Sequence, residues 1–479
     1  MKFGHKNLYI GGQLRESSSG AKRDVVCPAT DEIIATVAWA GATDAEAALA
    51  AAEQGFKKWS KTPIKQRAEI MQRLRTLVVR DQDKLREAVS FEHGKTWEQA
   101  EEDVVSLINA LGYYAEEILR MRGEILPDAE GTHEHKLVYE PLGVVVAYLA
   151  WNFPLLNLAF KIGPSMAAGC AIIIKPSSET PLSALMVGEL CAESGVPAGV
   201  VNILAGPNDP VSSILSGSKI PRMLTLIGST GTGQRIIHQG SSSIKRYSME
   251  LGGNAPALVF ADADLDHAAF LVSLLKFSNT GQICVTPNRV FIEATVFDVF
   301  AAKVVAHAQK VKLGHGRGSG ATMGPLINAA ACDRIASWVS EAVAQGAVLL
   351  HGGKRPASLP KGSFFEPTVL TKVTASMRVC CDEVFGPVVS LIPFKDEADA
   401  LAQANDTDAG LSSFLFTTDH ARALRVSAAL EFGEVMINGV KYNIDLPHGG
   451  VKQSGIGHDC SHLALHDYLT VKRITTALR

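Results

Sequence analysis

An alternation of short apolar runs with helical patterns between residues 142 and 240 constrains the fold more than any other feature of the sequence. The run 143–148 is rich in β-branched residues and apolar on both faces, which is typical of a strand covered on both sides. Strand patterns follow at 171–174, 200–204 and 222–227, with helical patterns at 182–194 and from about Gln234. This order predicts a doubly wound parallel α/β sheet, which binds ligands at the carboxyl ends of its strands.

Helical sequence precedes this region and a mixed segment follows it. Thr43 and Glu46 have the spacing of a capping box, so we predict a helix from Thr43 to Trp59. Amphipathic helical sequence covers about 65–120, and a second series of helices and strands covers about 255–440. A chain of 479 residues is long enough for about three domains, or for two large ones with appendages.

Composition and charge exclude several classes of partner. The net charge of -3 gives no electrostatic reason to expect binding to nucleic acid or to an anionic membrane, so we expect a small-molecule substrate. The longest apolar run, 142–151, is about half the length that spans a bilayer. The N-terminus lacks the apolar core of a signal peptide, which predicts a cytoplasmic location. The eight cysteines match neither a disulfide framework nor zinc-ligand spacing, so no metal is expected.

Two groups could carry covalent chemistry. Cys284 follows Gly281 and Gln282, which interrupt any helical pattern as a reactive turn would. Glu250 precedes Leu-Gly-Gly, where the glycines allow close approach of the backbone. Each has an ordinary alternative, because free cysteines are often buried hydrophobes and most glutamates are exposed. Together, a thiol nucleophile and a carboxylate base indicate chemistry through a thioester.

Polar residues also follow the predicted strands. Asn152 comes directly after the run 142–151, where its amide could donate to an oxyanion or only stabilise the turn before Pro154. Lys175 ends the strand at 171–174, and its alternative is a solvated surface lysine. The glycine-rich segment 228–233 lacks the lysine of a P-loop, but such a turn into a helix presents backbone N–H groups to a phosphate.

Six motifs occur in one order along the chain, and together they resemble the aldehyde dehydrogenase superfamily over essentially its whole length. The motifs are Trp-Asn-Phe-Pro from Trp151, Lys-Pro-Ser from Lys175, Gly-Ser-Thr-x-x-Gly from Gly228, Glu-Leu-Gly-Gly from Glu250, Gly-Gln-x-Cys to Cys284, and Glu-Val-Phe-Gly-Pro from Glu383. The resemblance implies a Rossmann-like cofactor domain (1–118 and 142–253), an α/β catalytic domain (254–452) and small oligomerisation segments (123–141 and 465–479). It also implies a homodimer or homotetramer.

The resemblance assigns roles to individual residues. Cys284 would be the nucleophile, Glu250 the base that activates water, and Asn152 the donor to the oxyanion, with Lys161 supporting the proton relay. Lys175 would contact the adenosine ribose, Ser229 the pyrophosphate, Glu383 the nicotinamide ribose and Phe385 the nicotinamide. The implied cofactor-binding residues are Trp151, Lys175, Ser177, Ser178, Gly206, Gly228, Ser229, Gly233, Glu383 and Phe385.

Ser178 bears on the choice of cofactor. Members of the superfamily that prefer NAD usually carry a glutamate at this position, which binds the adenosine ribose and would repel a 2′-phosphate. Because Ser178 removes that obstacle, NADP is slightly favoured over NAD. Two interpretations of Cys380 and Cys381 stay open: a redox-sensitive pair near the cofactor, or buried and inert thiols, which we favour.

The substrate pocket allows two interpretations. Phe160 stands where members that oxidise carboxylated semialdehydes often have an arginine, and the expected pocket wall favours an uncharged aldehyde. That wall consists of Phe153, Leu156, Phe160, Ile283 and Val285. Polar residues expected near the tunnel mouth favour an anionic tail instead: Arg289, Lys441, Tyr442, Asn443 and His448.

Three rival functions fit the sequence less well. A CoA-acylating dehydrogenase of the same superfamily commonly lacks the glutamate base, and Glu250 is present. A catalytically retired structural member would not need Cys284, Glu250 and Asn152 together. A cysteine hydrolase would pair Cys284 with one of the 14 histidines, but no histidine is placed beside it in the sequence. Hydrolytic aldehyde oxidation is therefore the preferred prediction.

Overall fold

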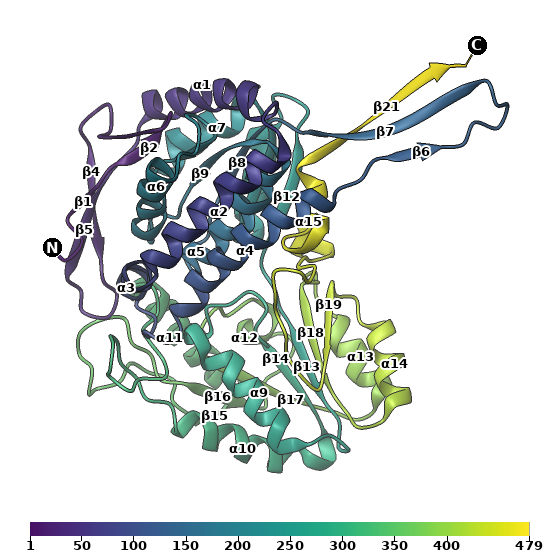
Figure 1. Ribbon diagram of the computed structural model, residues 1–479. Helices are drawn as coiled ribbons and strands as arrows, with labels where there is room; N and C mark the ends of the chain where they lie inside the picture. Colours follow the sequence, from purple (N-terminus) through teal and green to yellow (C-terminus); the bar gives the residue numbers. More distant parts are fainter. Residues whose placement is uncertain (479) are drawn as a thin grey trace.

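The computed structural model describes residues 1–478, which form two large sheets flanked by helices and a smaller sheet that projects from one side (Figure 1). A further small sheet near the N-terminus has the order β1-β5-β4, built from His5–Lys6, Ile33–Ala38 and Lys22–Val26. The fold is α/β, as the sequence predicts.

The first large sheet has eight strands in the order β20-β12-β11-β8-β9-β10-β2-β3. Its five central strands are parallel, and the outer strands β20, β2 and β3 pair antiparallel. The strands are β20 (Gly455–Ile456), β12 (Arg246–Glu250), β11 (Pro221–Ile227), β8 (Val144–Tyr148), β9 (Ala171–Lys175), β10 (Val201–Ile203), β2 (Leu8–Ile10) and β3 (Gln13–Arg15).

Helices cover both faces of this sheet. In β9, Ile172 and Ile174 belong to the core shared with one helical layer, whereas Ile173 between them belongs to the core on the opposite face. One layer contains α2 (Ile64–Arg80), α3 (Gln82–His93), α4 (Glu101–Arg120), α5 (Pro154–Ala168) and α6 (Leu182–Ser194); the other contains α1 (Ala42–Trp59), α7 (Ser213–Gly217) and α8 (Thr230–Gly240). Because successive side chains of a strand point to opposite faces, the all-apolar strands suit this sandwich.

The second large sheet has seven strands in the order β15-β16-β17-β14-β13-β18-β19, of which only β15 runs antiparallel to its neighbour. The strands are β15 (Val348–His351), β16 (Thr368–Thr371), β17 (Val388–Phe394), β14 (Arg289–Glu293), β13 (Pro256–Val259), β18 (Ser412–Phe416) and β19 (Glu434–Ile437). The helices of this part are α9 (Leu265–Phe277), α10 (Phe297–Gln309), α11 (Ala329–Ala344), α12 (Arg378–Cys381), α13 (Glu397–Asn405) and α14 (His420–Ala429).

The third sheet joins distant parts of the chain in the order β21-β7-β6, formed by Leu469–Ala477, His133–Pro141 and Glu124–Leu126. It projects away from both large sheets (Figure 1). The preceding helix α15 (Ser461–Asp467) instead packs against α5 and α4.

Two helix boundaries differ from the sequence prediction. The first turn of α1 is capped by Asp44, whose carboxylate accepts the N–H of Gly41 at 3.0 Å, so Thr43 lies inside the helix and the Thr43–Glu46 capping box does not form. Helix α8 begins at Thr230 rather than near Gln234, because Ser229 caps it and accepts the N–H of Thr232. No helix within residues 1–478 is long and apolar enough to cross a membrane.

Candidate active site

Cys284 lies just after a tight, left-handed stretch of backbone. Asn279 and Thr280 have positive φ values of 47° and 59°, and Gly281 has a φ of 70°. A Cβ atom on Gly281 would lie 2.2 Å from the carbonyl oxygen of Gly386, so only glycine fits there. The buried Gln282 closes the turn, because its amide donates to Asn279 and accepts the N–H of Ile327. The packing holds Cys284 half-buried at a fixed turn.

The Glu-Leu-Gly-Gly motif packs directly against this turn. Glu250 is the last residue of β12, at a carboxyl strand end of the first sheet. A Cβ atom on Gly253 would lie 2.2 Å from the carbonyl oxygen of Cys284, so the glycine permits the two backbone segments to touch. The motif therefore places the Glu250 carboxylate near the Cys284 thiol, at the boundary between the two large sheets.

Asn152 joins the same cluster from the end of β8. Its Nδ2 donates to the carbonyl oxygen of Gln282 at 3.1 Å, and Asn157 donates to its Oδ1 at 3.3 Å. The side chains of Lys95 and Asn279 both donate to its main-chain carbonyl at 3.0 Å. Since an amide nitrogen carries two N–H groups, one remains to donate beside the thiol.

Glu250 is buried, with 4% of its surface exposed, and neither carboxylate oxygen forms a hydrogen bond within residues 1–478. Burial raises the pKa of Glu250 to about 8; the charges of His448 and Lys161 oppose the rise, whereas that of Asp459 adds to it. A carboxyl group with a pKa near neutrality and free lone pairs is suited to act as a general base. Lys161 influences it only by charge, because its Nζ binds both oxygens of Asp459 at 2.6 and 2.7 Å.

His448 lies in the centre of this cluster rather than free at its mouth. Its Nδ1 donates to Glu434 Oε1 at 2.6 Å, and its Nε2 lies 3.7 Å from Glu250 Oε2. The pKa of the Cys284 thiol is raised, chiefly by burial, and the nearby His448 opposes the rise without cancelling it. No histidine stands near Cys284 in the sequence, and folding brings His448 from the C-terminal part of the chain toward the thiol.

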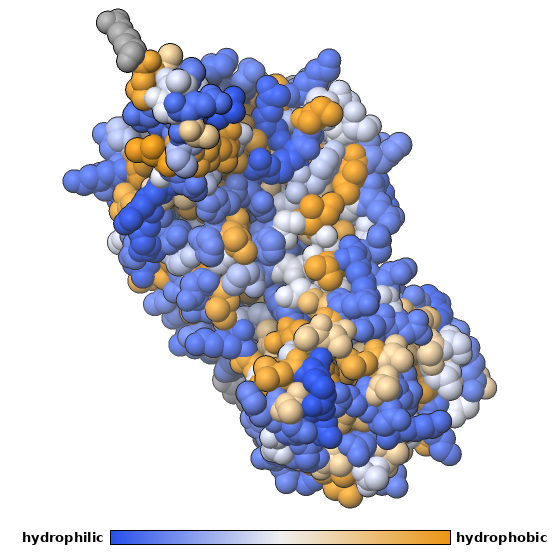
Figure 2. Space-filling view, turned by 90° about the vertical axis from the view of Figure 1, so that its right-hand side faces the viewer, coloured by the Kyte–Doolittle hydropathy of each residue, from blue (hydrophilic) through white to orange (hydrophobic). Residues whose placement is uncertain are grey.

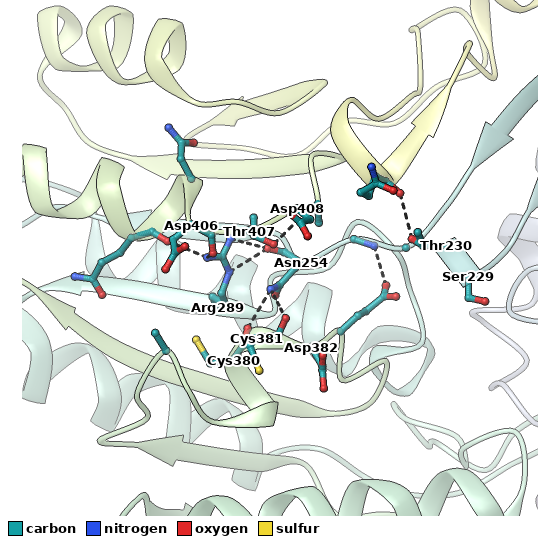
Figure 3. A pocket seen from close by; sticks show the side chains of 18 of the residues that line it. Ser229, Thr230, Asn254, Arg289, Cys380, Cys381, Asp382, Asp406, Thr407 and Asp408 are labelled. Carbon is teal, nitrogen blue, oxygen red and sulfur yellow. Dashed lines mark hydrogen bonds between the residues drawn. The ribbon is translucent and has the colours of Figure 1, made fainter. Parts of the chain in front are cut away.

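Two of the predicted cofactor residues, Ser229 and Glu383, line a cavity of about 1010 Å³ to which segments of both large sheets contribute (Figure 3). Ser229, at the start of α8, lines one side, and Glu383 lines another and accepts the N–H of Gly253 at 3.2 Å. Burial raises the pKa of Glu383 to about 7. Cys380 and Cys381 also line the cavity, and burial raises the pKa of both thiols. Cys380 is buried as expected, whereas Cys381 is exposed, which corrects the favoured expectation that both thiols are buried.

The remaining cofactor residues divide between strand ends and packing positions. Lys175 is buried at the end of β9, donates to Asn208, and has its pKa lowered to about 8 by burial and by the charge of Arg23. Ser177 and Ser178 follow it and are half-buried.

The aromatic and glycine positions are set by packing. The rings of Trp151 and Phe385 meet edge to face at 5.3 Å, with Phe385 at a positive φ of 48°. A Cβ atom added to Gly206 would lie 2.9 Å from the carbonyl oxygen of Ala40. A Cβ atom added to Gly228 would lie 3.3 Å from the Leu226 side chain, and one added to Gly233 would lie 2.7 Å from the Leu251 side chain. These glycines permit close packing of the strand ends.

The predicted pocket residues differ in exposure. Phe160 and Ile283 are half-buried, and the Phe160 ring lies 6.3 Å from that of His448. Phe153 and Val285 are buried, and the ammonium of Lys95 covers the Phe153 ring at 3.9 Å. Asn443 is exposed.

Arg289 does not lie at the tunnel mouth, and this corrects the sequence prediction. It is buried in β14, where its guanidinium donates to the carbonyl oxygens of Asn254, Gln403, Ala404 and Asp406 (Figure 3). Lys441 and Tyr442, from the same predicted group, are exposed. Arg289 is therefore a structural residue that joins loops, not a binder of substrate.

Sequence reasoning missed three supporting charges. Glu434 binds His448, Asp459 binds Lys161, and Asp103 binds Lys95 in an ion pair of 2.8 Å whose two side chains are fully buried. No local motif marks these residues as partners: Lys161 and Asp459 are 298 positions apart, and the other two pairs, 8 and 14 positions apart, match no recognised spacing. Only burial of the charges in the fold reveals them.

Comparison with known proteins agrees with this geometry. Residues 14–474 match the model of the aldehyde dehydrogenase family. The chain is 39% identical to a 3-sulfolactaldehyde dehydrogenase of Pseudomonas putida, covering 98% of this chain and 96% of that protein. It is 38% identical to the NADP-dependent succinate-semialdehyde dehydrogenase of Escherichia coli, covering both chains fully. A crystal structure of succinate-semialdehyde dehydrogenase from Burkholderia pseudomallei superposes with a TM-score of 0.97 at 40% identity, covering 99% and 98% of the two chains. This chain belongs to the aldehyde dehydrogenase family.

Proposed function

We propose that this enzyme oxidises an uncharged aldehyde to the carboxylic acid with NADP or NAD as acceptor, through a thioester on Cys284. The observation that carries the proposal is the convergence of Cys284, Glu250 and Asn152, which come from the turn after α9, the end of β12 and the loop after β8. Membership of the family makes NAD(P)-dependent aldehyde oxidation the activity of the chain.

The residues of the chain divide the reaction between them. The Cys284 thiolate attacks the carbonyl carbon, and the Asn152 amide with the Cys284 N–H stabilises the oxyanion. Bound NAD(P)⁺ supplies the hydride acceptor that converts the adduct into a thioester. Glu250 then takes a proton from a water molecule that attacks the thioester, and the acid is released. Retention of Glu250 favours water over CoA as the acyl acceptor.

The cavity beside these residues fits a dinucleotide. A Cβ atom on Gly252 would lie 2.8 Å from Glu383 Oε2, so the glycine keeps the cavity floor open next to a carboxylate suited to a ribose. Ser229 would lie at the pyrophosphate, Lys175 at the adenosine ribose and Glu383 at the nicotinamide ribose. Ser178 and the charges of Lys175 and Arg23 support use of NADP, because cations attract a 2′-phosphate.

We propose an uncharged substrate because the buried cations around the site already have anionic partners. Lys161 binds Asp459, Lys95 binds Asp103, and His448 binds Glu434. The half-buried Phe160 adds an apolar wall. An anionic tail would meet Glu250 and Glu434 without a free partner nearby, which is unfavourable in a buried site.

A panel of aldehydes tests both parts of the proposal. Neutral aliphatic, aromatic, hydroxylated, carboxylated and sulfonated aldehydes are offered with NAD and with NADP, and reduced nicotinamide is measured by absorbance. We expect neutral aldehydes to give kcat/KM values at least about tenfold above those of carboxylated aldehydes of equal length, because the carboxylate would find no charged partner in the site. The Cys284→Ala variant is the control. Equal failure of wild type and variant with every aldehyde would refute the enzyme assignment, and a preference for anionic aldehydes would refute the substrate class.

We further propose the domain division and assembly that the family resemblance implies. The cofactor domain would comprise 1–118 and 142–253, and the catalytic domain 254–452. The β21-β7-β6 sheet and its neighbouring residues, within 123–141 and 465–479, would join subunits into a homodimer or homotetramer. The long projecting strands support this proposal.

A further inference from the structure

Glu250 is a buried carboxylate that needs a counter-charge once it loses its proton. Its side chain is 4% exposed, and neither of its oxygens forms a hydrogen bond within residues 1–478. An ionised carboxylate that leaves water without a partner is costly, so it stays protonated instead. Among the same residues, the only ion-pair contact of Glu250 is with His448, whose Nε2 lies 3.7 Å from Glu250 Oε2. His448 is therefore the group placed to offset the charge of the base.

The backbone of His448 is fixed against this carboxylate. His448 and Asp459 form a bridge in which the N–H of each donates to the carbonyl oxygen of the other, at 2.9 and 2.7 Å. A Cβ atom on Gly449 would lie 3.3 Å from Glu250 Oε1, so the residue after His448 also lies close to the carboxylate. The side chain of Asp459 binds the ammonium of Lys161 at 2.6 and 2.7 Å. Lys161 thus already has an anionic partner, which leaves His448 as the cation for Glu250.

Glu434 and two aromatic rings set the orientation of the imidazole. Glu434 Oε1 accepts from His448 Nδ1 at 2.6 Å, and Glu434 Oε2 accepts from Ser412 Oγ at 2.5 Å. The rings of Phe160 and Tyr442 lie 6.3 and 6.2 Å from that of His448. Because Nδ1 donates to Glu434, Nε2 is the nitrogen left for a second partner. A carboxylate beside Nδ1 also favours the imidazolium, which can offer its Nε2–H to a second carboxylate.

We propose that His448, oriented by Glu434, is a positioning residue that pairs with Glu250 and keeps this buried base ionised for hydrolysis of the thioester. The three side chains then carry one positive charge between two negative ones. No proton passes between His448 and Glu250. When the base takes a proton from water, the water O–H bond breaks, an Oε–H bond forms and His448 stays an imidazolium. The inference rests on the proposed function for the role of Glu250 and adds the group that supports it.

The charges around the two groups agree with this pairing. Burial raises the pKa of Glu250 to about 8, and His448 is the largest influence that opposes the rise. Burial lowers the pKa of His448, but its acidic neighbours outweigh burial and raise the pKa well above the usual value. The imidazole is therefore charged in the pH range where the carboxyl titrates. The other titratable groups that surround the pair are Lys161, Cys284, Glu434, Tyr442, Asp459 and Cys460.

The pair acts on the second half of the reaction. Thioester hydrolysis needs the carboxylate form of Glu250, and a neighbouring positive charge favours that form. Without His448, burial and the charges of Asp459 and Glu434 would be opposed only by Lys161, so the pKa of Glu250 would rise further. Thioester formation does not use this base. Loss of His448 should thus slow hydrolysis at neutral pH and leave it intact at high pH.

Infrared titration of Glu250 tests the pair without aldehyde or nucleotide. The C=O stretch of the protonated carboxyl is followed in the full-length enzyme from acid to alkaline pH, and the Glu250→Gln counterpart of each protein isolates the band of this residue. The wild type should give a midpoint near 8. In His448→Gln, which keeps a donor for Glu434 but no charge, the midpoint should rise by at least about one unit, a tenfold change in the ionisation constant. His458→Gln, an exposed histidine, is the matched control and should leave the midpoint unchanged.

A reciprocal measurement covers the case in which His448→Gln does not fold. An ion pair shifts the pKa of both partners, so the imidazole should titrate lower once Glu250 can no longer be charged. The 14 histidines are labelled with carbon-13 at Cε1, and their signals are titrated by nuclear magnetic resonance in the wild type and in Glu250→Gln. One signal should titrate at least about one unit lower in the variant. If no signal moves by that amount, the ion pair is refuted, and this result needs no assignment of the signals.

Kinetics connect the pair to hydrolysis and separate this proposal from the proposed function. At pH 7 the rate of thioester hydrolysis in His448→Gln should fall about tenfold and should approach that of the wild type at high pH, while the first-turnover burst of reduced nicotinamide persists. A variant with a raised KM for aldehydes and an unchanged pH profile would show that His448 binds substrate, which refutes the proposal. An unchanged infrared midpoint also refutes it, even when the enzyme oxidises aldehydes. Inactivity of the wild type toward every aldehyde refutes the proposed function alone, because the two titrations still decide on the ion pair.

Discussion

Glu250 combines burial with two carboxylate oxygens that lack a protein hydrogen bond. At the scale of single residues, this property suits Glu250 to hydrolysis of the thioester rather than to its formation. A base must be deprotonated to accept a proton, and the pKa of Glu250 is raised to about 8, chiefly by burial. The rate of thioester hydrolysis should therefore increase as pH rises through about 8 and level off above it.

Replacing Glu250 tests this assignment. In Glu250→Gln the turnover rate should fall by about 10²–10⁴-fold, the usual contribution of a general base, and the pH dependence near 8 should vanish. The first turnover should persist as a burst of reduced nicotinamide, measured by rapid mixing, because the thioester still forms. A variant that loses the burst together with turnover would contradict a role confined to hydrolysis.

Ser178 determines a second property at this scale. We expect the wild type to use NADP at least as well as NAD, since no carboxylate at position 178 repels the 2′-phosphate. In Ser178→Glu the kcat/KM for NADP should fall at least about tenfold while that for NAD changes little, as measured by steady-state kinetics with one aldehyde. A hundredfold preference of the wild type for NAD would contradict the prediction.

At the scale of elements, the site depends on close contact between the segment after β12 and the turn before Cys284. Gly253→Ala would place a Cβ atom 2.2 Å from the carbonyl of Cys284, so one backbone segment must move. Overpacking of this kind costs about 1–3 kcal/mol, and the displaced Cys284 should lose most of its activity. Thermal unfolding and aldehyde oxidation measure the two effects.

Gly231→Ala provides the matched control for stability. This glycine lies in α8, and a Cβ atom there would meet nothing within 4 Å. Alanine favours helix over glycine by about 0.5–1 kcal/mol, so the variant should unfold at an equal or higher temperature. Equal destabilisation by both substitutions would show that the Gly253 contact has no special effect.

At the scale of the whole molecule, the projecting sheet leaves apolar side chains uncovered. Ile125, Val471 and Ile474 are 73%, 54% and 43% exposed, and Figure 2 shows apolar residues gathered on this part of the surface. A second copy of the chain would bury them, since a two- or three-stranded extension has little core of its own. Light scattering at micromolar concentration should detect a dimer or tetramer.

A double substitution tests this surface directly. Val471→Asp with Ile474→Asp should lower the oligomeric state, because two charges would have to be buried in the contact between subunits. Ile244→Asp is the control: Ile244 is 94% exposed but lies outside the projecting sheet, so the assembly should not change. A monomeric wild type, or an unchanged double variant, would contradict the proposed assembly.

The sequence predicts the parallel sheet, because all-apolar strands alternating with helices have few alternative arrangements. The helix predicted at 182–194 is α6 with the same bounds. Local capping was harder to predict, since the spacing of Thr43 and Glu46 fits a cap that the backbone does not form. The Asp44 cap forms instead because the helix begins at Ala42, so that the N–H of Gly41 faces the Asp44 carboxylate.

The sequence by itself determined the family and the reaction, and it predicts the thiol, the carboxylate and the amide of the proposed site, because each lies in a recognisable local motif. Only the tertiary structure decided the surroundings of these groups, such as the burial that raises the pKa of Glu250 and of Cys284. Glu434 and His448 carry no motif that links them, yet folding places them 2.6 Å apart beside Cys284. It also removed Arg289 from the substrate site by burying it among carbonyl oxygens. Electrostatic environment depends on distances between remote segments and on exclusion of water, and neither quantity is encoded at one position of the chain.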